Sequence, residues 1–206
     1  MNYTEITQTA LGYADREDVE VTDNVDNFLR VCESRINQRL SVQEMAVRSQ
    51  LPTVEDQEFY GLPSDFKSLR SIQYNANNTA GVTTLEYLNP AHSNAANQID
   101  GVSTHFYTII ANQVKVSPPP AAGVLEIVYH RKLPPLVAAG DNATNWLSDG
   151  YPEIYIFGLL VEISAFTKDK AAVDIWEARF QSAMEALSDE DSVSRWSGTP
   201  LRIRRG

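Results

Sequence analysis

The sequence predicts an α+β fold, in which N- and C-terminal helices form one bundle and an antiparallel β-rich module is inserted between them. Three observations predict it: apolar residues recur at helical spacing near both ends, short apolar runs alternate with turn signals in the middle, and residues 197–206 have no periodicity. The chain has 206 residues, 43% of them hydrophobic, which is enough to bury a core. We therefore expect a helical bundle from residues 1–41 and 145–196, a β-rich module from residues 42–144, and an extended tail from residues 197–206.

Two helices are expected at the N-terminus. Apolar residues recur at helical spacing over residues 3–13, which predicts a short first helix. Thr22 or Asp23 can cap a second helix, whose apolar stripe continues to Leu40. Cys32 lies on that stripe, so we interpret it as a packed, buried thiol.

The middle of the chain has the signals of short strands. The last of its apolar runs alternates with polar residues at a period of two, and residues 110–114 have the pattern of a tight hairpin. The expected strands are Met45–Leu51, Leu69–Tyr74, Val82–Tyr87, Phe106–Ile110, Val114–Val116 and Val124–His130.

Two further helices follow the β-rich segment. Pro152 can start one of them, and ten of the thirteen residues Ile154–Phe166 are apolar, which predicts a central helix that is buried on most sides. Asp169 can cap the last helix, which we expect to end near the acidic run 189–191 in a solvated terminus.

Charge is distributed unevenly along the chain. It contains 27 acidic and 17 basic side chains, a formal net charge of −10, whereas residues 192–206 contain four arginines and no acid. This balance argues against a protein that grips nucleic acid through phosphates or binds an anionic membrane. The N-terminus lacks the signal-peptide pattern and the longest apolar stretch is too short to cross a bilayer, so we expect a soluble intracellular protein.

No motif of an enzyme active site is present in the sequence. A single cysteine excludes internal disulfides and multi-cysteine zinc sites, and the three histidines, His92, His105 and His130, are interpreted as surface or structural residues. A hydrolase that uses Asp65, Asp100, His105 or His130 remains an alternative. A pocket that holds His105, His130 and a carboxylate would favour it. We expect no metal and no cofactor.

Three tryptophans differ in their surroundings. Trp176 lies on the apolar stripe of the last helix, and Trp146 is expected to anchor the loop that enters the central helix. Trp196 begins the tail and is the tryptophan expected to contact a partner. The tail alternates Leu-Arg-Ile-Arg, a pattern suited to adding an edge strand or lying in a groove of another protein.

Several stretches, in order along nearly the whole chain, resemble the head-to-tail adaptor (connector) proteins of tailed bacteriophages, particularly the short-tailed kind. The stretches are Glu33-Ser34-Arg35-Ile36-Asn37, Leu62-Pro63-Ser64-Asp65-Phe66, the hairpin from Phe106 to Pro118, Asn145-Trp146-Leu147 with Tyr151-Pro152-Glu153-Ile154-Tyr155, Trp176-Glu177-Ala178-Arg179-Phe180, and Pro200-Leu201-Arg202-Ile203-Arg204. The sequence departs from the family pattern at the Asn-rich loop Asn75–Thr83.

The resemblance implies a structural virion protein rather than an enzyme. It implies a ring, expected to be a dodecamer, which binds beneath the portal protein, extends the channel for double-stranded DNA without binding it specifically, and receives the tail or nozzle proteins. No membrane partner is implied, and the free protein is expected to be a monomer until it meets the portal. The expected portal-binding residues are Arg195, Trp196, Pro200, Leu201, Arg202, Ile203, Arg204 and Arg205, and the expected tail-protein-facing residues are Asn75, Asn77, Asn78, Ala111, Asn112 and Gln113.

Two non-enzymatic alternatives stay open. A different virion part, such as a tail-completion or nozzle ring protein, would contact the portal only through another ring. A cellular interaction module would account for the folded body but not for a basic tail on an acidic protein.

Overall fold

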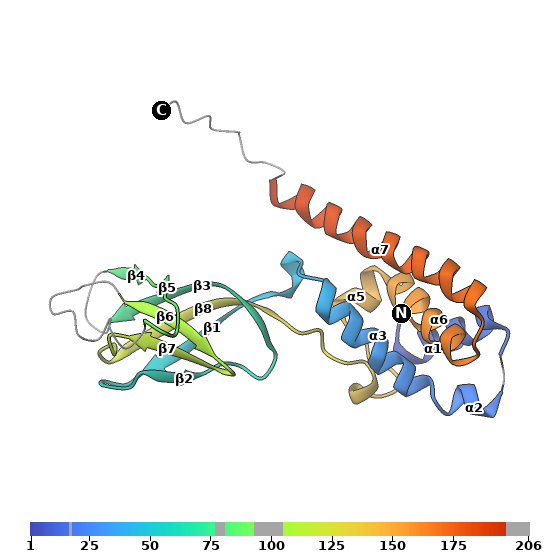
Figure 1. The fold of residues 1–206 in the computed structure, drawn as a ribbon, viewed down its shortest axis with the longest axis horizontal. Helices are drawn as coiled ribbons and strands as arrows, with labels where there is room; N and C mark the ends of the chain where they lie inside the picture. The colour runs from blue at the N-terminus through green and yellow to red at the C-terminus, as the bar shows by residue number, and fades with distance from the viewer. Residues whose placement is uncertain (17, 77–80, 93–104, 197–206) are drawn as a thin grey trace. The chain divides into compact units, whose positions relative to one another are not determined.

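The computed structural model describes residues 1–16, 18–76, 81–92 and 105–196, and confirms the α+β fold with helices at both ends and a β module between them (Figure 1). The chain divides into two units. Unit 1 contains Met1–Glu44 and Leu133–Gly206, and unit 2 contains Met45–Lys132.

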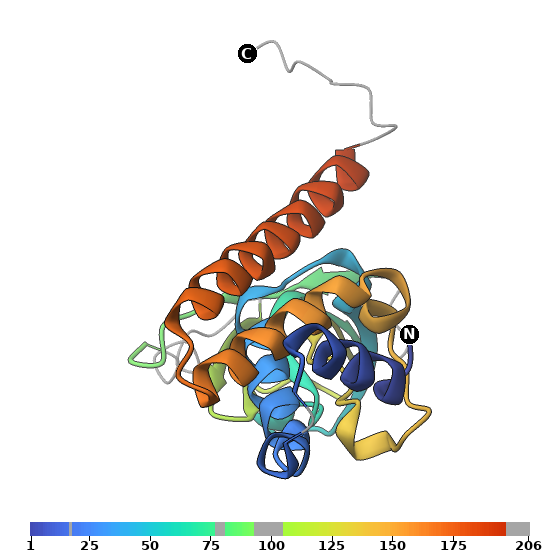
Figure 2. The ribbon, with the colours of Figure 1, turned by 90° about the vertical axis from the view of Figure 1, so that its right-hand side faces the viewer.

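Unit 1 is built around one central helix. Its helices are α1 (Tyr3–Ala14), α2 (Val19–Thr22), α3 (Val25–Arg39), α5 (Trp146–Gly150), α6 (Pro152–Phe166) and α7 (Lys170–Trp196). Helix α6 contacts α1, α3, α5 and α7, and Figure 2 shows it between α7 on one side and α1 and α3 on the other. The prediction of a central helix that is buried on most sides is confirmed, because α6 is apolar around most of its circumference. None of the described helices is both long enough and apolar enough to cross a membrane.

The helix boundaries agree with the sequence at two starts. Asn2 caps α1 in a capping box with Glu5, and the Oδ1 of Asp169 accepts a hydrogen bond from the backbone N–H of Ala172 at the start of α7. These helices begin where polar side chains satisfy free backbone N–H groups.

Two helix boundaries correct the sequence analysis. Thr22 and Asp23 do not cap the second long helix: Thr22 ends the separate short helix α2, where its hydroxyl donates to the carbonyl of Val19, and α3 begins at Val25 after Asn24. The last helix does not end in the acidic run either, because Asp191 is buried and α7 continues to Trp196. Local sequence could not show that the Asp191 carboxylate has partners in unit 1.

Unit 2 is a pair of four-stranded sheets. The strands are β1 (Ala46–Thr53), β2 (Phe59–Gly61), β3 (Phe66–Ala76), β4 (Val82–Thr84), β5 (Glu86–Tyr87), β6 (Phe106–Ile110), β7 (Gln113–Ser117) and β8 (Gly123–Arg131). Their orders are β1-β8-β3-β4 and β2-β7-β6-β5, with antiparallel pairs except for the parallel pair β5–β6. Residues from both sheets form the core, including Tyr60, Val114, Ile72 and Ile127.

Each expected strand overlaps an observed strand, with one addition, one division and one shifted start: Met45 lies in a 3-10 turn, and β1 begins at Ala46. Strand β2 was not expected, since three residues carry too little pattern to be recognised. The expected strand Val82–Tyr87 is divided at the buried Leu85, so that β4 and β5 join different sheets. The predicted hairpin is confirmed: β6 and β7 are antiparallel, with Ala111 in the left-handed backbone region at the turn.

The segment after β8 lies in unit 1, although the sequence analysis expected the β-rich module to reach residue 144. The N–H of Leu133 donates to Oδ1 of Asn37 at 2.8 Å, and the N–H of Leu136 donates to Oε1 of Glu33 at 2.7 Å. Both leucines are buried. Two polar side chains of α3 therefore fix this segment against the helices.

Candidate assembly surface

The C-terminal end of α7 is held by an ion pair and two hydrogen bonds. Oδ1 of Asp191 accepts from the backbone N–H of Gln43 at 2.8 Å. Arg195 forms an ion pair with Asp191, and its Nη2 donates to the carbonyl of Ser41 at 3.3 Å. The point at which the chain leaves α7 is thus fixed relative to the segment that follows α3.

Of the expected portal-binding residues, the structure describes the side chain of Arg195 alone. Trp196 ends α7, and its side chain is not described. The remaining residues, Pro200, Leu201, Arg202, Ile203, Arg204 and Arg205, lie outside the described residues. Docking of the tail therefore stays a prediction, and the described contacts of Arg195 are made within its own chain.

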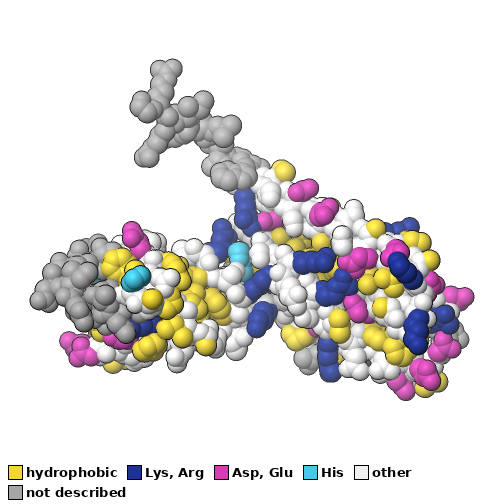
Figure 3. Space-filling model, in the orientation of Figure 1, with side chains coloured by type: hydrophobic (Ala, Val, Ile, Leu, Met, Phe, Trp, Pro, Cys, Tyr) yellow, Lys and Arg dark blue, Asp and Glu magenta, His cyan; other side chains and the backbone are white. Residues whose placement is uncertain are grey.

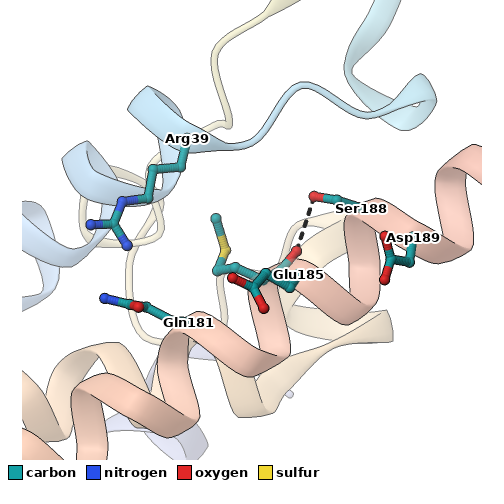
Figure 4. Close-up of a pocket in the computed structure, with 6 residues that line it drawn as sticks. Arg39, Gln181, Glu185, Ser188 and Asp189 are labelled. Atoms are coloured by element: carbon teal, nitrogen blue, oxygen red, sulfur yellow. Dashed lines mark hydrogen bonds between the residues drawn. The ribbon is translucent and has the colours of Figure 1, made fainter.

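A groove of about 530 Å³ lies between the end of α3 and the C-terminal half of α7 (Figure 4). Met184, which is 6% exposed, supplies its apolar floor. Glu185 and Asp189 line it from α7, and Arg39 lines it from α3. The face drawn in Figure 3 shows carboxylates along the outer edge of this half of α7. An apolar floor with carboxylates at its edge suits a ligand that is both cationic and apolar.

Beside this groove, Arg35 joins three helices. Its Nη1 donates to Oε1 of Glu162 at 2.9 Å, its Nη2 pairs with Glu177, and its guanidinium lies 5.1 Å from the ring centroid of Phe180. Burial disfavours the charge on Arg35, but hydrogen bonds and attraction from both carboxylates outweigh burial and raise its pKa. The Arg35 side chain therefore links α3 to α6 and α7.

Glu33 and Asn37 belong to the α3 stretch that carries the family resemblance, and the structure shows what they do. Both accept hydrogen bonds from the segment after β8, as described above. Glu33 is only 6% exposed, and burial raises the pKa of its carboxyl although the bond from Leu136 opposes the rise. This role of Glu33 was not expected from the sequence, although its spacing from Leu29 and Ile36 places it beside the apolar stripe.

Asn145 organises the next matching stretch. It caps α5 in a capping box with Ser148, and its Nδ2 donates to the carbonyl of Pro134 at 3.0 Å and to the hydroxyl of Tyr155 at 2.8 Å. Glu33, Asn37 and Asn145, which belong to stretches that carry the resemblance, thus make polar contacts that hold segments of unit 1 together.

An aromatic cluster lies partly exposed between α1, α6 and α7. The ring of Trp176 lies 6.4 Å from that of Tyr13 and 6.0 Å from that of Phe157, and the guanidinium of Arg179 lies 5.0 Å from the Trp176 ring. Tyr13 is 63% exposed. Trp176, expected in the core, is only half-buried, and aromatic residues with arginine are typical of interface hot spots.

The expected tail-protein-facing residues lie at opposite ends of unit 2. The ring of Tyr74, next to Asn75, stacks edge-on with His105 at the start of β6. The antiparallel β6–β7 pair puts its turn, residues 111–113, at the other end of these strands, where the N–H of Leu62 donates to the carbonyl of Asn112. Asn77 and Asn78 lie outside the described residues.

The residues of the hydrolase alternative face different partners. Nδ1 of His130 lies 3.1 Å from Oγ of Ser68, whereas Nδ1 of His105 lies 3.0 Å from the carbonyl of Pro118. Asp65 accepts a hydrogen bond from Tyr129 at 2.9 Å, and burial with this bond raises the pKa of Tyr129 to about 12. Asp100 lies outside the described residues, among which no three metal-ligating side chains form a cluster. The described contacts do not join these residues into one site.

A known protein family matches nearly the whole chain. The family model described as SU10 adaptor protein matches residues 1–204. No curated protein matches the chain. The matched range covers all the described residues of both units and every stretch on which the resemblance to phage adaptors depends.

Proposed function

The chain belongs to the SU10 adaptor protein family of bacteriophage structural proteins, and we propose that it acts as a head-to-tail adaptor that forms a ring beneath the portal. The observation that carries this proposal is the family match over residues 1–204. An adaptor of this kind is a component of the virion and contacts the portal on one side and tail proteins on the other. The proposed ring is a dodecamer of this chain.

Side-by-side packing of the helical units would form the ring. The partly exposed cluster of Tyr13, Phe157, Trp176 and Arg179 supports this step, because large aromatic side chains and arginine contribute most of the binding energy in many interfaces. The ion pairs of Arg35 with Glu162 and Glu177 also support ring formation, since a subunit that must fit two neighbours needs its helices held in one arrangement.

The acidic balance of the chain suits a channel for DNA. The formal net charge is −10, although residues 192–206 carry four arginines. Phosphates that pass a negative wall are repelled and do not adhere, so double-stranded DNA moves through without specific binding.

Docking to the portal is assigned to the tail. The ion pair of Arg195 with Asp191 holds the end of α7, so we place the portal contacts mainly in residues 197–206. In that segment Leu201 and Ile203 would fill apolar pockets, and Arg202, Arg204 and Arg205 would pair with portal carboxylates.

Unit 2 is the proposed receiver of the tail or nozzle proteins. The proposed tail-protein contacts are Asn75 and the 111–113 turn, which lie toward opposite ends of strand β6. Imaging of a ring labelled at residue 112 would show whether the turn faces the tail protein.

Deletion of residues 197–206 tests the portal contact. The truncated protein is expected to fold normally, since it keeps the helices α1–α7 and strands β1–β8, and to lose binding to purified portal in a pull-down. A full-length variant with Arg202, Arg204 and Arg205 changed to Gln keeps the tail but removes its charge, and it should bind the portal at least tenfold more weakly than the wild type. Normal decoration of portals by the truncated protein would contradict tail docking.

A further inference from the structure

The groove between α3 and α7 is chemically complementary to the chain's own tail. Glu185 and Asp189 line it, and the buried Met184 forms its floor. The cationic side chain that lines the groove, Arg39, already has a carboxylate nearby: Nη1 of Arg39 lies 3.7 Å from Oε1 of Glu177. The two α7 carboxylates therefore remain for a cationic ligand.

We propose that in the free subunit residues 197–206 fold back into this groove of the same chain, and that the portal competes for the tail. This inference rests on the proposed function. Arg202, Arg204 or Arg205 would pair with Glu185 and Asp189, and Ile203 would cover Met184. The free subunit thereby hides the segment with which it docks.

The lengths allow this contact within one chain. Helix α7 rises about 1.5 Å per residue, so Asp189 lies about 10 Å and Glu185 about 16 Å before Trp196. An extended chain covers about 3.3 Å per residue, so Ile203 can reach about 23 Å from Trp196 and Arg205 about 30 Å. Met184 lies about 18 Å before Trp196 along α7, so ten residues after Trp196 are enough to reach the groove.

Because the tail is attached to α7, even a weak contact is sufficient to keep it in the groove of its own chain. A segment attached by a short link has an effective concentration in the millimolar range at a nearby site. A peptide affinity weaker than about 1 mM would leave the groove mostly empty, and a tighter one would fill it in most free subunits. Portal sites gathered in a ring can outcompete such a contact without any change of fold.

A labelled peptide of residues 197–206 tests the proposal by fluorescence anisotropy. We expect it to bind protein truncated after Trp196 with a Kd of about 0.1 mM or lower, and to bind the full-length protein about tenfold more weakly, because a tethered tail at a millimolar effective concentration already occupies the groove. The double variant E185K/D189K in the truncated protein should weaken peptide binding at least tenfold. The matched control is D174K, which changes an exposed carboxylate elsewhere on α7 and should leave binding unchanged.

Each outcome decides one of the two proposals. Equal peptide binding by truncated and full-length protein, or by E185K/D189K and D174K, overturns the fold-back contact. If the peptide fails to bind while the deletion still abolishes portal binding, the fold-back contact is wrong and tail docking stands. If the peptide binds as expected while the truncated protein still binds portals, tail docking is wrong and the fold-back contact stands.

Discussion

Glu33 shows how one buried carboxylate connects distant parts of the chain. It lies in α3, yet it accepts a hydrogen bond from the N–H of Leu136, 103 residues away. A buried carboxylate is costly, and the bond from Leu136 offsets part of the cost. Burial still dominates, so the pKa of Glu33 is raised and the neutral form is favoured in the folded protein.

Substitution of Glu33 predicts a pH-dependent change in the free energy of unfolding. A raised folded pKa means that the stabilising contribution of Glu33 is fully present below the ordinary Glu pKa, about 4.3, and is lost as the pH rises through the folded value. Relative to E33Q, the wild type should therefore gain stability between pH 7 and pH 5 in urea denaturation. At pH 7, E33Q should be at least as stable as the wild type, because its amide oxygen can still accept from Leu136.

E33A separates the hydrogen bond from the charge. It leaves the buried N–H of Leu136 without an acceptor and should cost about 1–3 kcal/mol at pH 7. The control is E153Q, at an exposed position near the start of α6. An E33Q curve parallel to the wild type between pH 5 and 7 would show that burial does not dominate the titration.

At the scale of elements, the close approach of α3, α6 and α7 depends on Gly158. A Cβ at this position would overlap the Sγ of the buried Cys32 in α3 and would lie 3.0 Å from Cε2 of Phe180 in α7. The prediction that Cys32 is a packed thiol is confirmed, and its close neighbour is a glycine of the central helix. Three helices meet where one of them has no side chain.

G158A is expected to destabilise unit 1 even though alanine favours helices. Overpacking costs about 1–3 kcal/mol, which exceeds the gain of about 1 kcal/mol from helix propensity. The matched control is G12A in α1, where an added Cβ meets nothing within 4 Å and should raise stability by about 0.5–1 kcal/mol. Thermal unfolding of both variants measures the difference.

A double variant checks the cause of the G158A effect. C32A removes the sulfur atom that the new methyl group would meet, so C32A/G158A should lose less stability than the sum of the two single losses. Strict additivity would place the strain at Phe180 instead.

At the scale of the whole molecule, the chain enters unit 2 at β1 and leaves it from β8, and these two strands are paired. Ala46 lies opposite His130 in the antiparallel register, so the ends of unit 2 are adjacent. Such a unit can be removed without separating the remaining ends, because antiparallel partners have Cα atoms only about 5 Å apart.

We predict that residues 45–132 fold alone and that a Gly-Ser-Gly link in their place leaves unit 1 folded. Circular dichroism and NMR dispersion of the two fragments measure this. Excision of the broader span expected from the sequence, residues 42–144, is the comparison: it removes the buried Leu133 and Leu136 and should destabilise the bundle, at about 2 kcal/mol for each leucine. Equal stability of both excised bundles would contradict the assignment of residues 133–144 to unit 1.

Periodicity was a sufficient guide where a segment buries one face along its length. The central helix, the capped start of α7 and the long strands could all be predicted, because period and capping residues are local properties. The short strand β2 and the end of α7 could not, since β2 depends on pairing with β7, and the buried Asp191 depends on Gln43.

The sequence by itself determined the fold class, the order of helices and strands, the uneven charge and, through its motifs, the adaptor family. The tertiary structure alone decided the roles of the polar residues: within those motifs, Glu33 and Asn37 hold the segment after β8 and Arg35 joins three helices, and outside them Glu185 and Asp189 line one groove. The reason is physical. Patterning reports which side of a segment is buried, whereas the partner of a buried charge is set by chain segments far away in sequence, and it exists only once they have packed.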